Sequence, residues 1–280
     1  MKTWLTLVLI SCALGGFAGA ASAASDPAPN PGTVLITGSD RGLGMALARE
    51  FTQRGWRVIA TCREPDKAAE LVQFAHDHPS VSIEKLDVTD NAAIDALVVK
   101  LKGQPIDVLF NSAGVSGTID GQSLAKLAPD EFDRILRVNS YAPLRISTAF
   151  LDLVAASKQR KIIGMTSGYG SVSSVRDVTA GGYPNAYFYA MSKAALNMGL
   201  HMFALEVAGR GVTTIVMSPG AVDTDMQRDM RTYMAGIGKP LTAPQITPAE
   251  SAHAMVVTVE NLKPEQNGKF LSRSGAEVPW

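Results

Sequence analysis

Residues 33–44 read TVLITGSDRGLG, in which a short apolar run leads directly into a glycine-rich loop. Residues 33–37 have the length and apolar character of a buried strand. The loop carries Gly38, Gly42 and Gly44, and glycine leaves backbone amides accessible to a phosphate at the start of a helix. Because this loop follows a strand and opens a helical pattern, it predicts a nucleotide-binding βαβ unit. A tight turn that binds nothing is the alternative.

The rest of the chain alternates between strands and helices in the same way. Strand-length apolar runs recur at residues 57–61, 81–86, 106–110, 162–166, 213–217 and 269–272. Apolar residues at three- and four-residue spacing lie between them, at residues 43–54, 91–102 and 129–156. Thr247, Pro248 and Glu250 form a capping box that begins a further helix. This order predicts an α/β fold, a doubly wound parallel sheet (Rossmann fold) of about seven strands with helices on both faces.

The first 32 residues differ in composition from the rest. Lys2 precedes an apolar run at residues 4–17, and Ala21-Ser22-Ala23 has the form that signal peptidase cleaves. Residues 25–32 are rich in proline and resemble a spacer. These features are typical of a secretory signal.

The leader therefore predicts the following organisation: a signal peptide at residues 1–24 cleaved near 23–24, a spacer at 25–32, and a single domain at 33–280. The mature protein would be exported, to a periplasm, to the medium or to an ER-type lumen. Two alternatives remain for the leader. Residues 9–12 resemble a lipoprotein box, and an uncleaved leader could anchor the chain in a membrane.

Composition excludes several classes of partner. The chain has 280 residues, 46% of them hydrophobic, which is ample for one large α/β domain. Basic and acidic residues both number 26, so the net charge is zero and no nucleic-acid partner is expected. His76 and His78 have no third ligand nearby, so no metal site is expected. Only Cys12 and Cys62 occur, so removal of the leader would leave no intrachain disulfide.

Several further motifs match one family in order. The spacing Gly-x-x-x-Gly-x-Gly after Thr37 resembles that of the short-chain dehydrogenase/reductase family, in its compact single-domain branch. The other matching motifs are Asp87 in residues 86–89, residues 110–114, Asn139, Ser167, Tyr189-x-x-x-Lys193 and residues 218–224. Residues 110–114 read FNSAG, in which Ser112 replaces an asparagine of the family's NNAG. The resemblance covers residues 33–272. It implies a Rossmann fold and hydride transfer between a nicotinamide cofactor and a carbonyl or alcohol.

The segment between Ser167 and Tyr189 is longer than in many relatives. Its additional residues, 175–185, resemble the extension of carbonyl-reductase and C-factor-like relatives. Such a segment can shape the pocket or cover a helix face used for dimers. A dimer and a monomer therefore both remain open.

Tyr189 and Lys193 form the expected catalytic pair. They are four residues apart on a helical pattern and share a face, whereas Tyr187 points elsewhere and is expected in the pocket wall. A free phenol has a pKa near ~10. The Lys193 ammonium and an oxidised nicotinamide would lower it, so that Tyr189 exchanges a proton with the reacting oxygen. Ser167 would hydrogen-bond that oxygen. By the resemblance, Lys193 also holds the cofactor ribose, and Asn139 positions a water beside Lys193.

The cofactor is expected to be NADP(H), with NAD(H) as the alternative. In NAD-dependent enzymes an acid usually ends the second strand, but Cys62 stands there in this chain. Arg63 and Arg41 suit a ribose 2′-phosphate, whereas Glu64 could instead accept a hydrogen bond from a ribose hydroxyl. The residues expected to contact the cofactor are Gly38, Asp40, Arg41, Gly42, Leu43, Gly44, Arg63, Asp87, Val88, Asn111, Ala113, Gly114, Tyr189, Lys193, Pro219, Gly220, Val222 and Thr224.

Met226, Met230 and Met234 stand at helical spacing within residues 223–246. By the resemblance this segment is a lid, which predicts a small hydrophobic carbonyl or alcohol substrate; ordinary core packing is the alternative.

The expected function is an NAD(P)-dependent oxidoreductase. Two further functions are weighed, a cofactor-binding sensor or C-factor-like signalling protein, and an epimerase or dehydratase of the family's extended branch. The complete catalytic set favours the oxidoreductase, because a sensor needs no proton path.

Overall fold

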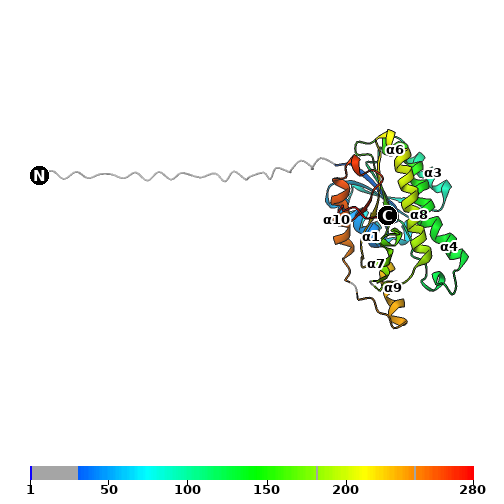
Figure 1. Ribbon diagram of the computed structural model, residues 1–280. Helices are drawn as coiled ribbons and strands as arrows, with labels where there is room; N and C mark the ends of the chain where they lie inside the picture. Colours follow the sequence, from blue (N-terminus) through cyan, green and yellow to red (C-terminus); the bar gives the residue numbers. More distant parts are fainter. Residues whose placement is uncertain (2–30, 181, 243) are drawn as a thin grey trace.

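A seven-stranded parallel sheet forms the centre of the molecule in the computed structural model (Figure 1). The structure describes residues 1, 31–180, 182–242 and 244–280. Apart from Met1, the predicted signal peptide lies outside the described residues, as does most of the predicted spacer. No helix within the described ranges is long and apolar enough to cross a membrane.

The strands follow one another in the order of a doubly wound sheet. They are β1 Thr33–Ile36, β2 Arg57–Cys62, β3 Val81–Lys85, β4 Val108–Asn111, β5 Lys161–Met165, β6 Thr213–Ser218 and β7 Phe270–Ser272. In space the order is β3-β2-β1-β4-β5-β6-β7, and all neighbours are parallel. The order reverses between β1 and β4, and in such sheets ligands bind at the carboxyl ends of the strands beside this point. The predicted fold class is confirmed.

Helices cover both faces of the sheet. They are α1 Gly42–Gln53, α2 Ala69–Asp77, α3 Asn91–Lys100, α4 Pro129–Leu136, α5 Ala142–Ala149, α6 Leu151–Ala155, α7 Val175–Ala180, α8 Tyr187–Glu206, α9 Asp225–Gly236 and α10 Pro248–Glu260. Successive residues of a strand point to opposite faces, so Val34 and Ile36 join the core under α1 and α10, while Leu35 joins the core under α3 and α5. Figure 1 shows α1 and α10 on one side of the sheet and α3, α4 and α8 on the other.

The helical pattern at residues 129–156 is not one continuous helix. A π-helical turn, η3 (Arg137–Tyr141), follows α4 and leads into α5, and α6 completes the segment. A π turn inserts one extra residue and changes which side chains face inward. Here it buries Asn139, which is 0% exposed.

The capping box predicted at α10 is confirmed. Thr247 Oγ1 accepts a hydrogen bond from Glu250 N at 3.1 Å, and Thr247 N donates to Glu250 Oε2 at 2.7 Å. The helix therefore begins where the sequence pattern places it.

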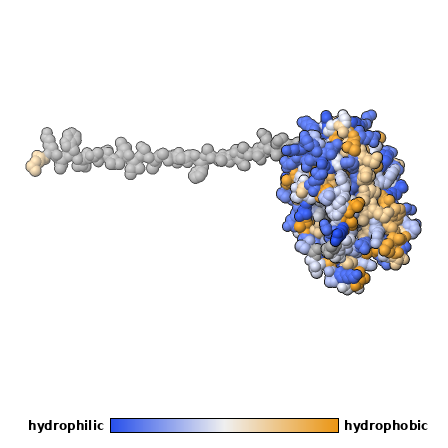
Figure 2. Space-filling view, in the orientation of Figure 1, coloured by the Kyte–Doolittle hydropathy of each residue, from blue (hydrophilic) through white to orange (hydrophobic). Residues whose placement is uncertain are grey.

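The outward face of α8 is apolar. Its exposed residues before Glu206 are Met191, Ala195, Met198, Met202 and Leu205. Figure 2 shows hydrophobic residues gathered on the side where α8 lies in Figure 1. The extra segment at 175–185 leaves these side chains exposed and instead contributes Asp177 and Tyr183 to the central cavity.

Candidate active site

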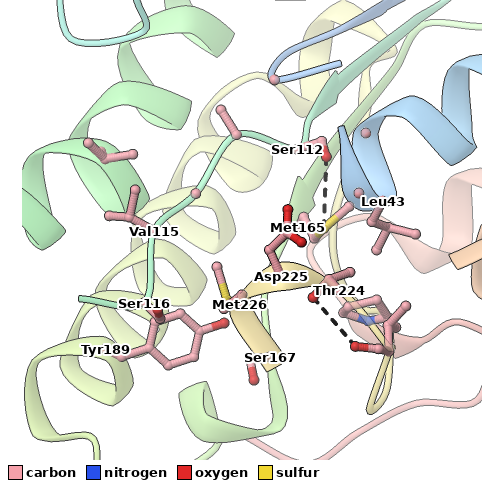
Figure 3. A pocket seen from close by; sticks show the side chains of 18 of the residues that line it. Leu43, Ser112, Val115, Ser116, Met165, Ser167, Tyr189, Thr224, Asp225 and Met226 are labelled. Carbon is pink, nitrogen blue, oxygen red and sulfur yellow. Dashed lines mark hydrogen bonds between the residues drawn. The ribbon is translucent and has the colours of Figure 1, made fainter. Parts of the chain in front are cut away.

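A cavity of about 980 Å³ opens at the carboxyl ends of the strands (Figure 3). Most of the residues predicted to contact the cofactor line it, namely Gly38, Asp40, Arg41, Gly42, Leu43, Gly44, Arg63, Asp87, Val88, Ala113, Gly114, Tyr189, Lys193, Pro219, Gly220, Val222 and Thr224. Ser167 lines it as well. Most of these residues follow the carboxyl ends of six strands, whereas Tyr189 and Lys193 come from α8, so the sheet and this helix together form the site.

The glycine loop closes tightly at the start of α1. A Cβ added to Gly44 would lie 1.9 Å from the carbonyl oxygen of Gly38, so no larger residue fits there without moving the backbone. No side chain caps the N-terminus of α1, and its first turn holds no acidic residue. The amides of that turn therefore face the cavity without a competing acceptor, as a phosphate site requires.

Thr37 joins the glycine loop to the loop after β4. Its Oγ1 accepts hydrogen bonds from Ser112 N at 3.0 Å and from Ala113 N at 3.1 Å. In Figure 3, Ser112 also points toward Met165 at the end of β5, with 4.0 Å between Oγ and Sδ. No pattern in the sequence predicts this structural role for Thr37.

A smaller recess adjoins the cavity at the end of β2, and Arg41 and Arg63 line both. Within the described part of the chain, neither guanidinium makes a salt bridge. Glu64, the residue that argues for NAD(H), accepts a hydrogen bond from Lys67 at 2.6 Å, and this bond lowers the pKa of Glu64. Cys62 is buried and lines the cavity where an acid would hold a ribose hydroxyl.

Asp87 is held by the residue two positions after it. Burial raises the pKa of Asp87, but hydrogen bonds from the Thr89 hydroxyl (2.7 Å) and backbone amide (2.8 Å) outweigh this effect and lower it. The carboxylate therefore stays ionised at the edge of the cavity.

Tyr189 and Lys193 both belong to α8 and line the cavity. Ser167, which follows β5, lies near Tyr189 (Figure 3). Burial raises the pKa of Tyr189 to about 12, although a hydrogen bond with Ser167 acts in the opposite direction. Lys193 is only 5% exposed, and burial lowers its pKa to about 8. Lys193 Nζ donates to the carbonyl of Met165 at 2.9 Å and lies 5.7 Å from the centre of the Tyr189 ring.

In the protein without cofactor, the predicted lowering of the Tyr189 pKa by Lys193 is therefore wrong, and the contribution of an oxidised nicotinamide stays a prediction. The lysine is near the phenol but is bonded to a backbone carbonyl, so loss of solvent dominates. The phenol remains protonated throughout the neutral range.

Two predicted asparagines are not part of the cavity wall. Asn111 is buried, and its Nδ2 donates to Ser147 Oγ at 3.1 Å. Asn139 accepts from Val115 N at 2.9 Å and donates to Val115 O at 2.7 Å and to Ser192 Oγ at 3.0 Å. Both amides face the protein interior, so each supports the wall from behind.

The aromatic residues of the site also differ from expectation. Tyr187 does not line the cavity, so its predicted place in the pocket wall is wrong. Tyr169 and Tyr183 line it instead. The ring of Tyr169 packs edge-on against Tyr189, with 5.7 Å between the ring centres, and its hydroxyl donates to Pro184 O at 2.7 Å. No sequence spacing marks these residues, because they meet only after the chain folds.

The methionine stripe on α9 divides between two environments. Met226 and Met230 line the cavity, as the lid prediction expects. Met234 is buried against Leu241 in a small apolar cluster, as the packing alternative expects. Figure 1 places α9 at one end of the molecule.

Among the described residues, no group of three or more histidine, cysteine, aspartate or glutamate side chains could hold a metal ion. His76 is exposed on α2, and His78 Nδ1 shares a hydrogen bond with Phe74 O at 2.8 Å.

A doubly wound sheet with a phosphate-binding loop, a Tyr-Lys pair and a serine at one cavity defines a nicotinamide-dependent oxidoreductase. The chain belongs to the short chain dehydrogenase family, whose sequence model matches residues 32–235. It is 33% identical over 263 residues to an uncharacterized oxidoreductase of Schizosaccharomyces pombe, and the match covers 88% of this chain and 97% of that protein.

Two solved structures have the same fold over nearly their full length. Carbonyl reductase Sniffer of D. melanogaster has a TM-score of 0.76 and 26% identity, and the match covers 89% of this chain and 99% of that chain. The NADPH-bound carbonyl reductase from chicken fatty liver has a TM-score of 0.75 and 29% identity, with 90% and 100% covered. The predicted family and oxidoreductase function are confirmed, and the sensor alternative is not favoured.

Proposed function

We propose that the protein uses NADPH to reduce small apolar carbonyl compounds, with Tyr189 as the proton donor. The observation that carries this proposal is the cavity beside the glycine loop, which brings together Tyr189, Ser167 and Lys193. Burial raises the pKa of the Tyr189 phenol, so in the protein without cofactor it carries the proton that reduction of a carbonyl requires.

The residues around the cavity fit a dinucleotide. The uncapped first turn of α1 and the close approach at Gly44 suit the diphosphate, and Asp87, which lines the cavity, would contact the adenine end. When bound, NADPH supplies the hydride to the carbonyl carbon. Ser167 orients the carbonyl oxygen by a hydrogen bond, and Tyr189 gives that oxygen its proton. Lys193 holds the cofactor ribose and supplies a positive charge near the phenol.

The preference for NADP(H) rests on the charges around the smaller recess. Arg41 and Arg63 line both spaces and make no salt bridge with any residue that the structure describes, so they are available to a 2′-phosphate. Lys67 donates a hydrogen bond to the Glu64 carboxylate, which could otherwise have accepted one from a ribose hydroxyl. The similar chicken carbonyl reductase is NADPH-bound, which agrees with this arrangement.

Apolar side chains at the α9 side of the cavity support an apolar substrate, although Asp177, Asp225 and Asp229 line the cavity as well. Val115, Tyr169, Tyr183, Met226 and Met230 line it, and the last two belong to α9. Methionine side chains adapt to ligands of different shape, which suits a lid over varied carbonyl compounds. We take residues 223–246 as this lid.

The test is a panel of ketones and aldehydes, with NADPH oxidation followed by absorbance. Tyr189→Phe removes the transferable proton and should abolish turnover while NADPH binding remains. Tyr187→Phe is the matched control, because it lies two residues away on the same helix but outside the cavity. NADPH binding without turnover across the whole panel would favour a sensor, and a dead Tyr187→Phe beside an active Tyr189→Phe would refute the assignment.

We further propose that the protein is exported and that its leader is removed. The apolar run, the Ala21-Ser22-Ala23 site and the proline-rich spacer support this proposal. Mass spectrometry of the native protein from fractionated cells should find an N-terminus between Ala21 and Asp26 outside the cytosol. Peptides from residues 1–20 in a membrane fraction would indicate an uncleaved anchor, and the same peptides in the cytosol would refute export.

For the oligomeric state, we propose that two copies pair through α8. The exposed stripe from Met191 to Leu205 repeats at intervals of three and four residues and contains no charged side chain. Two such stripes can face each other across a two-fold axis without like charges meeting. Light scattering should give a dimer, and Met198→Glu should give a monomer. A monomeric unchanged protein would contradict the proposal.

A further inference from the structure

Gln122 is a fully buried polar side chain next to the catalytic helix. It ends a short 3₁₀ turn, η2 (Asp120–Gln122), and is 0% exposed. Its Nε2 donates hydrogen bonds to Ser116 O at 2.8 Å and to Thr118 O at 3.0 Å. Its Oε1 accepts a hydrogen bond from Tyr189 N at 2.8 Å.

These three bonds join two parts of the active site. Ser116 belongs to the wall of the cavity, and Tyr189 is the third residue of α8. The first amides of a helix have no acceptor within the helix, so one of them must find a partner elsewhere. Gln122 supplies that partner at the residue whose side chain is the phenol. Both amide hydrogens and the amide oxygen of Gln122 are used, so a side chain without a carboxamide cannot replace all three bonds.

The loop at residues 115–118 also makes hydrogen bonds to side chains other than Gln122. Glu131 Oε1 accepts from Thr118 N at 2.6 Å, and Asn139 bonds both backbone groups of Val115. The loop at residues 115–118 would therefore stay attached to the protein without Gln122. What Gln122 adds is the direct link between this loop and the backbone of Tyr189.

We infer that Gln122 is a positioning residue, which sets the distance of the Tyr189 phenol from the substrate wall. It acts through the backbone at Ser116, Thr118 and Tyr189 and does not touch the reacting atoms. This inference rests on the proposed reduction. A displacement of about 1 Å in a reacting group can cost roughly 100-fold in rate, so loss of the link should lower kcat by about 10- to 100-fold.

The experiment compares Gln122→Met with a matched control at the other end of α8. Methionine has a similar length but makes none of the three bonds. Asn267 is also a side-chain amide that bridges backbone groups, because it accepts from Thr214 N at 2.8 Å and donates to Ala204 O at 2.9 Å. Both Gln122→Met and Asn267→Ala should lower the melting temperature. Only Gln122→Met should lower kcat, while both variants keep the NADPH Kd of the unchanged protein.

The variant Gln122→Glu provides a second test, because lowering the pH should restore part of its activity. The ionised carboxylate keeps the acceptor for Tyr189 N but has no donors for the two carbonyls, whereas the protonated carboxyl regains one donor. The rate of this variant relative to the unchanged protein should therefore rise as the pH is lowered. A purely structural role would give no such recovery in kcat.

A second readout does not depend on turnover. In protein with labelled tyrosine, the Cζ resonance of Tyr189 is assigned by its loss in Tyr189→Phe. It should shift in Gln122→Met and stay in place in Asn267→Ala. If the unchanged protein reduces no carbonyl, the proposed function fails and the resonance still tests the positioning role. If Gln122→Met keeps the resonance, or keeps kcat on an accepted substrate within about twofold, the inference on Gln122 is wrong.

Discussion

Replacement of Gly44 by alanine tests whether the glycine loop cradles the cofactor. The added Cβ would lie 1.9 Å from Gly38 O and 2.8 Å from Gly38 C, and both contacts are to backbone. Real Cβ atoms essentially never approach closer than 3.0 Å, so the loop or the start of α1 must move by about 1.1 Å. A side chain cannot rotate away from this clash, because the obstacle is the main chain.

The expected magnitude follows from the bonds that such a shift would misalign. Hydrogen bonds to a charged group contribute about 1.5–3 kcal/mol each. Loss of one amide-phosphate bond should therefore weaken NADPH binding by roughly 10- to 150-fold, at about 1.4 kcal/mol for each factor of ten.

NADPH fluorescence titration gives the Kd of Gly44→Ala, and thermal melting without cofactor gives the effect on the fold. Gly209→Ala is the control, since a Cβ at Gly209 meets no atom within 4 Å. It should bind NADPH like the unchanged protein. A Gly44→Ala protein that binds NADPH normally would show that the diphosphate does not rest on this loop.

Three shorter predictions concern the cofactor, the proton chemistry and the extra segment. Arg41→Ala and Arg63→Ala should each reduce the preference for NADPH over NADH, measured as a ratio of Kd values, by about tenfold or more. Equal affinities for the two cofactors in the unchanged protein would contradict the proposed phosphate site. Because burial lowers the pKa of Lys193 to about 8 in the free protein, its ammonium is lost as the pH rises through 8, so kcat/KM for reduction should fall between pH 7 and 9. A flat kcat/KM profile would contradict this role. Tyr169→Phe removes the bond to Pro184 and should lower the free energy of unfolding by about 1 kcal/mol in chemical denaturation, with NADPH binding unchanged.

Sequence patterns were sufficient for the sheet and for most of the cavity wall. Strands such as 33–36 are short apolar runs, and the residues that follow them converge because parallel strands end at one edge of the sheet. Gly44 could be placed at the cofactor site from its position after the first strand, and Ser167, Tyr189 and Lys193 could be placed beside it through the family resemblance. The motif positions are local, and local patterns are what a sequence displays.

The directions of buried side chains could not be read in this way. Asn111 and Asn139 stand where the resemblance puts them, yet both amides turn inward, the second within a π turn that the helical pattern does not predict. Gln122 and Tyr169 have no diagnostic spacing. Each acquires its place from partners that are far away in the chain.

The sequence by itself determined the order of strands and helices, the glycine loop and the register of Tyr189 with Lys193, because periodicity and short spacings suffice for these. Only the tertiary structure decided three features of the site. Lys67 donates a hydrogen bond to the Glu64 carboxylate, Lys193 donates one to the Met165 carbonyl, and burial keeps the Tyr189 phenol protonated. The pKa of a side chain depends on the water it loses and the groups that surround it, and both exist only once distant segments have packed together.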